Sequence, residues 1–450
     1  DVSVYSCVKS YGINGIDAYA VTVETTLSRS IPSFDVVGLP DAAVKESRSR
    51  VQSALVHAGY ELPVAKITVN LAPASQKKSG PAFDLPIFLA VMLASQQLEA
   101  LPEKSAFVGE LGLSGQLRPI NGVLSMAIQA KADGILRLYV PQANAKEASI
   151  VDGLEVYPVS DIEQLCRCLC GQQEIAPLPF DPMLLLDGGN RFTEDLCEVR
   201  GQGFAKRALE IAAAGGHNLL LIGPPGTGKS MLAKRLPTIL PKLSFEEAIQ
   251  TTRIYSVAGM LPPDHPIMNT RPFRSPHHTV SPAGLTGGGS SPVPGEISLA
   301  HNGVLFLDEL PEFQRQSLEV LRQPIEDSCV TISRAASRVT YPCSMMFVAA
   351  MNPCPCGYRG HPSIACTCSE NAVQRYISKI SGPLLDRIDL HVEVAPVQFH
   401  DLTGSSTEES SAVVRARVEK ARKLQQERFA GEPFHCNARI PAGKLQQYCP

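Results

Sequence analysis

Gly223-Pro-Pro-Gly-Thr-Gly-Lys-Ser230 is the stretch that decides the fold class of this chain. It matches the phosphate-binding pattern G-x-x-x-x-G-K-[S/T] at every fixed position. The apolar run Asn218–Ile222 before it predicts a buried parallel strand, and Met231–Arg235 after it predicts the start of a helix. The glycines let backbone N–H groups turn toward a triphosphate, and the helix N-terminus adds partial positive charge. The expected ATP-binding residues are Gly223, Pro224, Pro225, Gly226, Thr227, Gly228, Lys229 and Ser230.

The bulk composition is typical of a globular protein with more than one domain. The chain has 450 residues, 44% hydrophobic and 19% charged, and a single core rarely grows that large. Because no apolar run reaches membrane-spanning length and no signal-peptide pattern is present, we expect a cytoplasmic protein without membrane contact. The net charge of −3 means that any nucleic-acid contact needs a local basic surface. Thirteen cysteines indicate reduced thiols, with clustered ones available for metal.

The pattern along the chain predicts an α/β protein in three units. Up to residue 172, strand patterns alternate with helical patterns, and turn-forming residues make 173–194 a linker. The second unit, 195–398, contains the phosphate loop. The third, 399–450, is expected to be a truncated helical unit with too little chain for its own core. The strands expected in the first unit are 18–24, 66–71 and 138–141; the helices are 42–58, 84–96 and 126–132 in the first unit and 412–429 in the third.

A second apolar strand ends in two carboxylates suited to ATP hydrolysis. Val304–Leu307 is followed directly by Asp308 and Glu309, about 80 residues after the phosphate loop. We expect Lys229 to reach the β- and γ-phosphates, and Ser230 and Asp308 to hold Mg²⁺. Glu309 would then orient and polarise the attacking water.

Asn352 and Arg387 complete the predicted catalytic set. Asn352 follows the apolar run Met346–Met351 and would position water near the γ-phosphate, although a strand-end cap is the alternative. Arg387 lies at a helix end before a strand, where it cannot easily serve its own site. We therefore expect it to reach the γ-phosphate of a neighbouring subunit. The alternative is a structural pair with Asp386 or Asp389.

These motifs together resemble an AAA+ ATPase, and the sequence between them resembles the magnesium-chelatase-like branch. With its N-terminal unit included, the chain resembles the ComM/YifB family over essentially all 450 residues. The segments that carry the resemblance are Gly201-Gln202, Arg271–Thr279, Leu285–Gly289 and Pro294–Glu309.

The resemblance implies an AAA+ P-loop αβα domain followed by a small helical lid, with ATP and Mg²⁺ as cofactors. It implies a homo-oligomer, a hexameric ring, that acts as a DNA motor. In this family such a motor is understood to drive branch migration, and so homologous recombination of incoming DNA, during natural transformation. A magnesium-chelatase-type motor subunit that remodels a protein partner is the alternative, and an ATP-dependent peptidase is a third possibility.

Two basic segments are candidates for DNA contact. The Pro/Gly-rich insertion from Met260 to Gly295 shows no regular elements, and long loops of this kind are usually functional. Val330–Tyr341 predicts a β-hairpin, and in the resembling branch such a hairpin projects into the central pore. The alternatives are an insertion packed on its own ring and an ordinary solvated hairpin. The expected contacts with single-stranded or branched DNA are Arg271, Arg274, His277, His278, Arg334 and Arg338.

A cysteine cluster directly follows Asn352. Four thiols lie within 15 residues, and four thiolates around one ion form the usual tetrahedral zinc site. The C-x-C spacing differs from the commoner C-x₂-C, and disulfides or free thiols are the alternatives. The expected Zn²⁺ ligands are Cys354, Cys356, Cys366 and Cys368. A second group, Cys166, Cys168 and Cys170, is interpreted as buried thiols on a helix face.

The N-terminal unit resembles the proteolytic domain of Lon, without its catalytic dyad. The similar segments are Phe107–Met126 and Lys78–Pro86, and at the places of the Ser nucleophile and its Lys stand Ala82 and Met126. Neither can form or activate a nucleophile. The resemblance implies a ribosomal-S5-domain-2-like fold used for ring assembly or DNA binding. The cations available for phosphate contact, or for an ordinary solvated face, are Arg48, Arg50, Lys66, Lys77 and Lys78.

Overall fold

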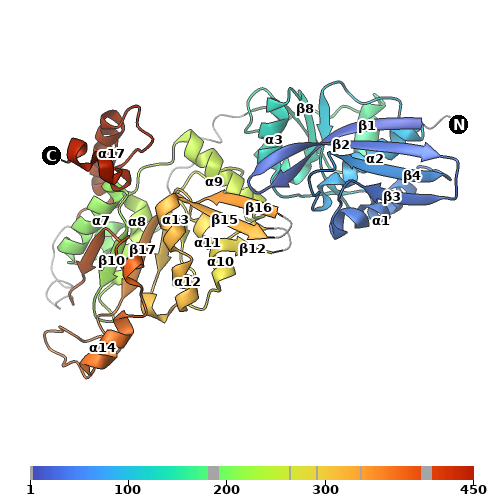
Figure 1. Ribbon diagram of the computed structural model, residues 1–450. Coiled ribbons are helices and arrows are strands. Elements are labelled where there is room, and N and C mark those ends of the chain that lie inside the picture. The colour runs from blue at the N-terminus through green and yellow to red at the C-terminus, as the bar shows by residue number, and fades with distance from the viewer. Residues whose placement is uncertain are drawn as a thin grey trace. The chain divides into compact units, whose positions relative to one another are not determined.

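The computed structural model describes residues 4–180, 192–262, 265–289, 292–334, 337–396 and 408–449 (Figure 1). The chain divides into two compact units. Unit 1 comprises residues 1–187 and 252–268, and unit 2 comprises 188–251 and 269–450. The segment 252–268, which the sequence suggested would belong to the ATPase domain, therefore packs with the N-terminal unit. Most of the predicted linker, residues 181–191, lies outside the described residues.

Unit 1 contains a four-stranded sheet in the order β1-β2-β4-β3. All neighbours are antiparallel except β3 and β4, which are parallel. Alternate residues of β4 are buried, so one face of the sheet carries the core. Helix α1 packs against β3, and α2 against β1 and β2. The bounds are β1 Val4–Asn14, β2 Asp17–Ser28, β3 Ser33–Val37, α1 Ala42–His57, β4 Lys66–Ala72 and α2 Asp84–Ala94.

A second, parallel sheet in unit 1 has the order β5-β8-β9 and supports a separate apolar cluster. The predicted strands 18–24, 66–71 and 138–141 lie within β2, β4 and β8, and the predicted N-terminal helices correspond to α1, α2 and α3. The remaining bounds are β5 Ser105–Phe107, β6 Glu110–Leu111, β7 Leu117–Arg118, α3 Val123–Ala132, β8 Arg137–Pro141, α4 Ala145–Ala148, β9 Glu155–Val159 and α5 Ile162–Leu169.

Unit 2 is built on a five-stranded parallel sheet in the order β11-β14-β17-β10-β18. Figure 1 labels its neighbouring strands β10 and β17. The first strand of the core, β10, lies between the later strands β17 and β18. The chain order reverses there, and in open α/β sheets ligands bind at the carboxyl ends of the strands at this point. The strand bounds are β10 Leu219–Ile222, β11 Phe273–Arg274, β14 Val304–Leu307, β17 Met346–Met351 and β18 Leu390–Glu393.

Helices and two short hairpins surround this sheet. The insertion before β14 contains α10 and the pair β12–β13, so the expectation that it lacks regular elements was wrong. The helices are α7 Gly203–Gly215, α8 Lys229–Ile239, α10 Pro282–Thr286, α11 Glu296–Leu299, α12 Arg315–Glu319, α13 Arg322–Asp327, α14 Glu370–Ile377, α15 Gly382–Leu385, α17 Ser411–Arg428 and α18 Leu445–Tyr448. Helix α9, Phe245–Val257, begins in unit 2 and ends in unit 1. The hairpin strands are β12 Gly287–Gly288, β13 Val293–Pro294, β15 Cys329–Arg334 and β16 Ser337–Pro342.

The predicted C-terminal helix is α17, and it packs on the ATPase sheet domain rather than opening a separate unit. Val414 and Val418 join the same apolar cluster as β10 and α8. The Ser411 hydroxyl contacts the Thr238 hydroxyl at 2.6 Å and accepts a 2.7 Å hydrogen bond from the Leu196 N–H. In the described part of the chain, no helix has the length and apolarity needed to cross a bilayer.

Candidate ATP-hydrolysis site and cysteine cluster

The phosphate loop connects β10 to α8, as the sequence predicted. Gly226 and Gly228 have φ of 78° and 85°, a left-handed conformation that favours glycine. The loop starts close to the next strand, because the Gly223 N–H donates to the Met351 carbonyl at 3.2 Å. A Cβ at Gly223 would lie 2.3 Å from the Val394 carbonyl oxygen, so glycine is required there.

Lys229 begins α8 and is buried. Its ammonium donates to the carbonyls of Gly223 at 2.7 Å and Pro224 at 2.8 Å, and it lies 3.2 Å from Oδ1 of Asn352. Burial lowers the pKa of this ammonium. Because Asn352 follows β17, the structure brings these two predicted residues together across neighbouring strands.

Ser230 and Asp308 also meet, from α8 and the end of β14. The Ser230 hydroxyl donates to Oδ2 of Asp308, so the two oxygen ligands expected for Mg²⁺ are adjacent. The next residue, Glu309, has φ 53° and ψ 47° and an exposed side chain. A non-glycine residue in this region carries strain, which clusters at functional sites.

His278 lies beside Glu309, and the sequence analysis did not predict this contact. Its Nδ1 is 3.9 Å from Oε2 of Glu309, and its ring lies 4.0 Å from that of His277, centroid to centroid. β11 pairs in parallel with β14, so the segment that leaves β11 emerges on the same sheet edge as Asp308. Only the strand pairing, and no local sequence signal, brings this imidazole to the predicted hydrolytic carboxylate.

The two arginines of the insertion that were expected to contact DNA are both engaged within unit 2. Arg271 forms an ion pair with Glu247 at 2.9 Å and donates to the carbonyls of Pro241 and Asn302. Arg274 binds Glu296 through two hydrogen bonds of 2.6 and 2.7 Å. Both guanidinium groups therefore hold the fold, and this geometry argues against their role as phosphate contacts.

The predicted hairpin is confirmed as β15 and β16, an antiparallel pair with Ser333 opposite Arg338. One face is buried through Val330, Ile332, Val339 and Tyr341. The Arg338 side chain is exposed on the other face. The hairpin tip and the side chain of Arg334 lie outside the described residues.

Arg387 lies at the sheet edge opposite the phosphate loop. Its carbonyl accepts a 2.9 Å hydrogen bond from the amide of Asn218, just before β10 starts, whereas the phosphate loop follows the other end of β10. Four strand residues separate these ends by about 13 Å. Its guanidinium pairs with Glu326, and not with Asp386 or Asp389 as the structural alternative had it. Asp389 instead accepts from the N–H of Asn218.

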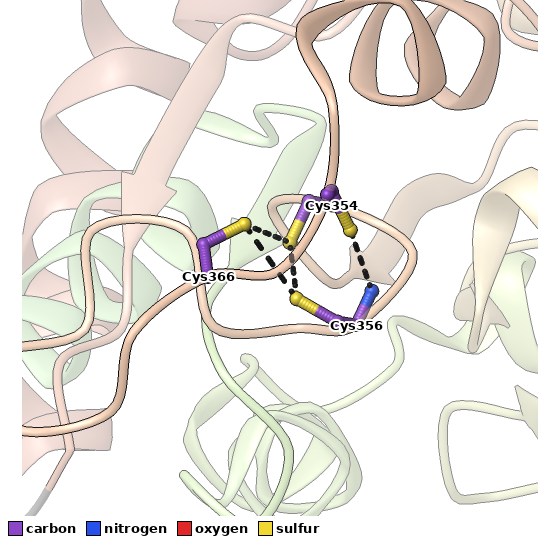
Figure 2. Close-up of side chains that lie close together, drawn as sticks. Cys354, Cys356 and Cys366 are labelled. Atoms are coloured by element: carbon purple, nitrogen blue, oxygen red, sulfur yellow. Dashed lines mark hydrogen bonds between the residues drawn. The ribbon is translucent and has the colours of Figure 1, made fainter.

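The four cysteines predicted to bind zinc converge on one point. Figure 2 labels three of them, Cys354, Cys356 and Cys366. The four Sγ atoms all lie within 4.8 Å of one another. The separations are 3.3 Å for Cys354–Cys356, 3.7 Å for Cys354–Cys366 and 3.6 Å for Cys356–Cys366. Cys368 accepts a hydrogen bond from the Cys356 N–H at 3.4 Å. Backbone N–H groups of Tyr358 and Thr367 lower the pKa of the Cys356 thiol to about 5.

The cysteine loop packs against the phosphate loop. Gly357, with φ 87°, approaches so closely that a Cβ there would lie 2.6 Å from Cδ of Pro225 and 3.9 Å from Cγ of Asn352. The cysteine cluster therefore packs beside the phosphate loop and supports the ATP site. In the other cysteine group, Cys166 is buried on α5, and burial raises its pKa to about 11. Cys168 is partly buried and Cys170 is exposed, so that group is only partly buried.

The two positions that replace the Lon dyad share one apolar cluster in unit 1. Ala82 and Met126 are 7% and 2% exposed and pack in the same core. Lys78 is fully buried and donates to the Pro73 carbonyl. Among the described residues, this region therefore holds an apolar core where a peptidase would need a nucleophile and its base.

The strand order, the phosphate loop and the convergence of Lys229, Ser230, Asp308 and Asn352 define a P-loop ATPase of the AAA+ class. Family models agree: residues 195–402 match "Magnesium chelatase, subunit ChlI", residues 23–144 match "Subunit ChlI of Mg-chelatase", and residues 408–450 match "Magnesium chelatase, subunit ChlI C-terminal". The chain belongs to the ComM/YifB family of magnesium-chelatase-like proteins.

Two relatives carry this assignment. The uncharacterized protein YifB of Escherichia coli is 42% identical over 99% of this chain and 86% of its own length. Competence protein ComM of Haemophilus influenzae is 44% identical over 97% of this chain and 84% of its own length.

Proposed function

We propose that this protein is an ATP-hydrolysing motor subunit that assembles into a ring and acts on DNA, as a branch-migration helicase in the recombination of incoming DNA. The observation that carries the ATPase part is the convergence of the phosphate loop with Asp308 and Asn352 at the carboxyl edge of the sheet. The DNA part is supported by the 44% identity to a protein named for competence.

In the proposed reaction each side chain has one task. Lys229 would neutralise charge on the β- and γ-phosphates, and Ser230 and Asp308 would hold Mg²⁺, which supplies further charge neutralisation at the phosphates. Glu309 would orient the attacking water and take up its proton, and Asn352, at the end of the next strand, would help to position that water near the γ-phosphate. His278, 3.9 Å from Glu309, belongs to this group rather than to the DNA contacts.

Arg387 is proposed to complete the site of a neighbouring subunit. Its carbonyl is bound at the start of β10, and the phosphate loop follows the other end of this strand, which is about 13 Å long. Its side chain is 28% exposed. The guanidinium would exchange its pair with Glu326 for the γ-phosphate of the next protomer when a ring, proposed as a hexamer, closes. An arginine supplied in trans stabilises the charge that develops during phosphoryl transfer.

The cysteine cluster is proposed to hold a structural Zn²⁺. With Zn–S bonds of about 2.3 Å, tetrahedral geometry separates the sulfurs by about 3.8 Å. The Sγ separations among Cys354, Cys356 and Cys366, 3.3 to 3.7 Å, are close to this value, and all four Sγ atoms lie within 4.8 Å of one another. Four thiolates form a closed site, which suits a structural ion. Here it would keep the loop around Gly357 against Pro225.

Arg271 and Arg274 are engaged within the fold. We therefore propose the β15–β16 hairpin as the element that faces DNA. Arg338 is exposed on it and would contact phosphates without regard to sequence. His277 stays a candidate contact at the edge of the hydrolysis site. The alternative function, a chelatase-type motor that remodels a protein partner, is favoured by the family-model matches to a magnesium-chelatase subunit.

The test is the ATPase rate of the purified protein alone, with single-stranded DNA and with forked DNA. We expect DNA to stimulate hydrolysis, and the protein to move a labelled four-way junction in an ATP-dependent way that Glu309→Gln abolishes. A protein that hydrolyses ATP but neither binds DNA nor responds to it would overturn the DNA motor and favour the chelatase-type alternative.

A further inference from the structure

Two basic residues of unit 1, Arg50 and Lys78, are held by partners within the fold. Arg50 is held by the buried carboxylate of Asp84, with Nε 2.6 Å from Oδ2 and Nη2 3.0 Å from Oδ1. Lys78 is buried and donates to a backbone carbonyl. Both therefore stabilise the fold and are unavailable to a ligand.

A second set of cations gathers around one pocket of about 500 Å³. Lys45 and Arg48 are exposed and lie three residues apart on α1, so they share a face of that helix. Lys66 begins β4, which pairs with the edge strand β3. In the part of the chain that the structure describes, no ion pair engages any of these three side chains. The pocket is lined by Phe34, Asp35, Val36, Val37, Lys45, Arg48, Lys66 and Thr68.

The charge balance of this pocket favours an anion. Among its described lining residues, Asp35 is the one carboxylate against three cations, and the whole chain carries a net charge of −3. The nearest acid on the same helix, Glu46, lies 3.7 Å from Arg50 instead. Three cations that converge without carboxylate partners repel one another, and this arrangement is stabilised when an anion binds between them.

The lining chemistry points to a phosphate chain rather than to bases. Phe34 is 2% exposed, so its ring is not available for stacking. Apart from the Asp35 carboxylate, the polar side-chain groups of the lining are the Thr68 hydroxyl and the ammonium and guanidinium groups, which suit phosphate oxygens. Two of the three cations are exposed along α1, where a polymer can pass over them.

We propose that Lys45, Arg48 and Lys66 form a binding site for the phosphodiester backbone of DNA in the N-terminal unit. This inference rests on the proposed function as a DNA motor and adds a DNA contact outside the ATPase unit. Contact of this kind is independent of sequence and depends strongly on salt.

The test compares two triple variants of the full chain by fluorescence anisotropy with a labelled single-stranded oligonucleotide over a range of salt. The pocket variant carries Lys45→Ala, Arg48→Ala and Lys66→Ala. The control removes the same charge from exposed lysines outside the pocket, at Lys9, Lys104 and Lys146. Thermal unfolding and ATP hydrolysis without DNA verify that both variants are folded.

We expect the pocket variant to bind DNA at least about tenfold more weakly than the control. We also expect the slope of log K against log salt to fall in magnitude by about 2, since each phosphate contact with a single strand contributes about 0.7. The single change Asp35→Asn, which removes the opposing carboxylate, should tighten binding.

Three outcomes decide between the hypotheses. If the pocket variant and the control bind DNA equally, this inference is wrong and the proposed function stands. If the unaltered protein does not bind DNA, both fail. If the pocket changes weaken the binding of free triphosphate but leave DNA binding unaltered, the pocket serves a small anion and the DNA assignment is overturned.

Discussion

The buried side chain of His301 allows a quantitative test of the packing next to β14, the strand that leads to Asp308. It precedes β14, the strand that carries Asp308, and is 4% exposed. Its Nδ1 accepts the Ser344 N–H at 3.0 Å, so the neutral ring carries its proton on Nε2, which lies 3.2 Å from Oε1 of Gln250. Protonation would add a proton at Nδ1 that faces another N–H. Burial lowers the pKa of His301 to about 4.

The expected loss of stability on acidification follows from the difference between the pKa values of His301 in the folded and unfolded states. The pKa is lower in the folded state than in the unfolded state, where it is about 6.5. Stability is therefore complete above about pH 6.5 and is lost as the pH falls toward 4. From these values, protonation of the His301 imidazole in the unfolded state should lower the free energy of unfolding by about 2 kcal/mol at about pH 5, relative to neutral pH. The decrease should reach about 3 kcal/mol once the folded form is protonated as well.

The informative change is His301→Asn, because the Asn Oδ1 can still accept the Ser344 N–H. Loss of the bond to Gln250 should cost about 1 kcal/mol at about pH 7.5. The additional loss of about 2 kcal/mol between about pH 7.5 and 5 should disappear in the variant. Urea unfolding at both pH values measures each quantity, and the exposed His435→Asn is the matched control. If His301→Asn and the unaltered protein lose the same stability on acidification, the assignment of a buried neutral imidazole is wrong.

Three further predictions concern the proposed chemistry. Lys229→Ala should abolish nucleotide binding, whereas Glu309→Gln should bind ATP and hydrolyse it at least about 10²-fold more slowly; near-normal turnover would remove Glu309 from the water-positioning role. The protein purified without chelator should contain about one zinc per chain, and Cys354→Ser should lose it and bind ATP more weakly, while Cys170→Ser keeps it; absence of zinc by elemental analysis would end this proposal. Arg387→Ala and Lys229→Ala chains, each inactive alone, should recover ATPase activity when mixed, because some interfaces join two intact halves; no recovery would make Arg387 structural.

The local motifs of this protein could be predicted from its sequence because each is contiguous. The phosphate loop needs glycines at fixed places between a strand and a helix, and these requirements are written within about a dozen residues. Long strands such as β2 and β4 and the helix α17 carry enough apolar pattern to be recognised. The four cysteines were also predicted to converge on one zinc ion, because they lie within 15 residues of one another.

Charge pairing depended on the tertiary structure, since the partners are distant in sequence. Arg271 and Arg274 were expected to contact DNA, but their carboxylates, Glu247 and Glu296, lie 24 and 22 residues away. In the same way, Asp84 binds Arg50 across 34 residues, while Arg48 two positions earlier forms no ion pair among the described residues. A sequence shows how many cations a segment has, but only the fold shows which of them are neutralised.

Strand pairing likewise decided which residues meet at the candidate site. β11 contains only Phe273 and Arg274, too short for a sequence pattern, yet its parallel pairing with β14 brings His278 to Glu309. The close approach of Gly357 to Pro225 also joins segments more than a hundred residues apart. The sequence by itself therefore determined which chemical groups this protein carries for ATP and metal. The three-dimensional packing decided which of these groups face a ligand. A side chain is neutralised or left free by partners that lie far away in the sequence, and only the fold brings these partners together.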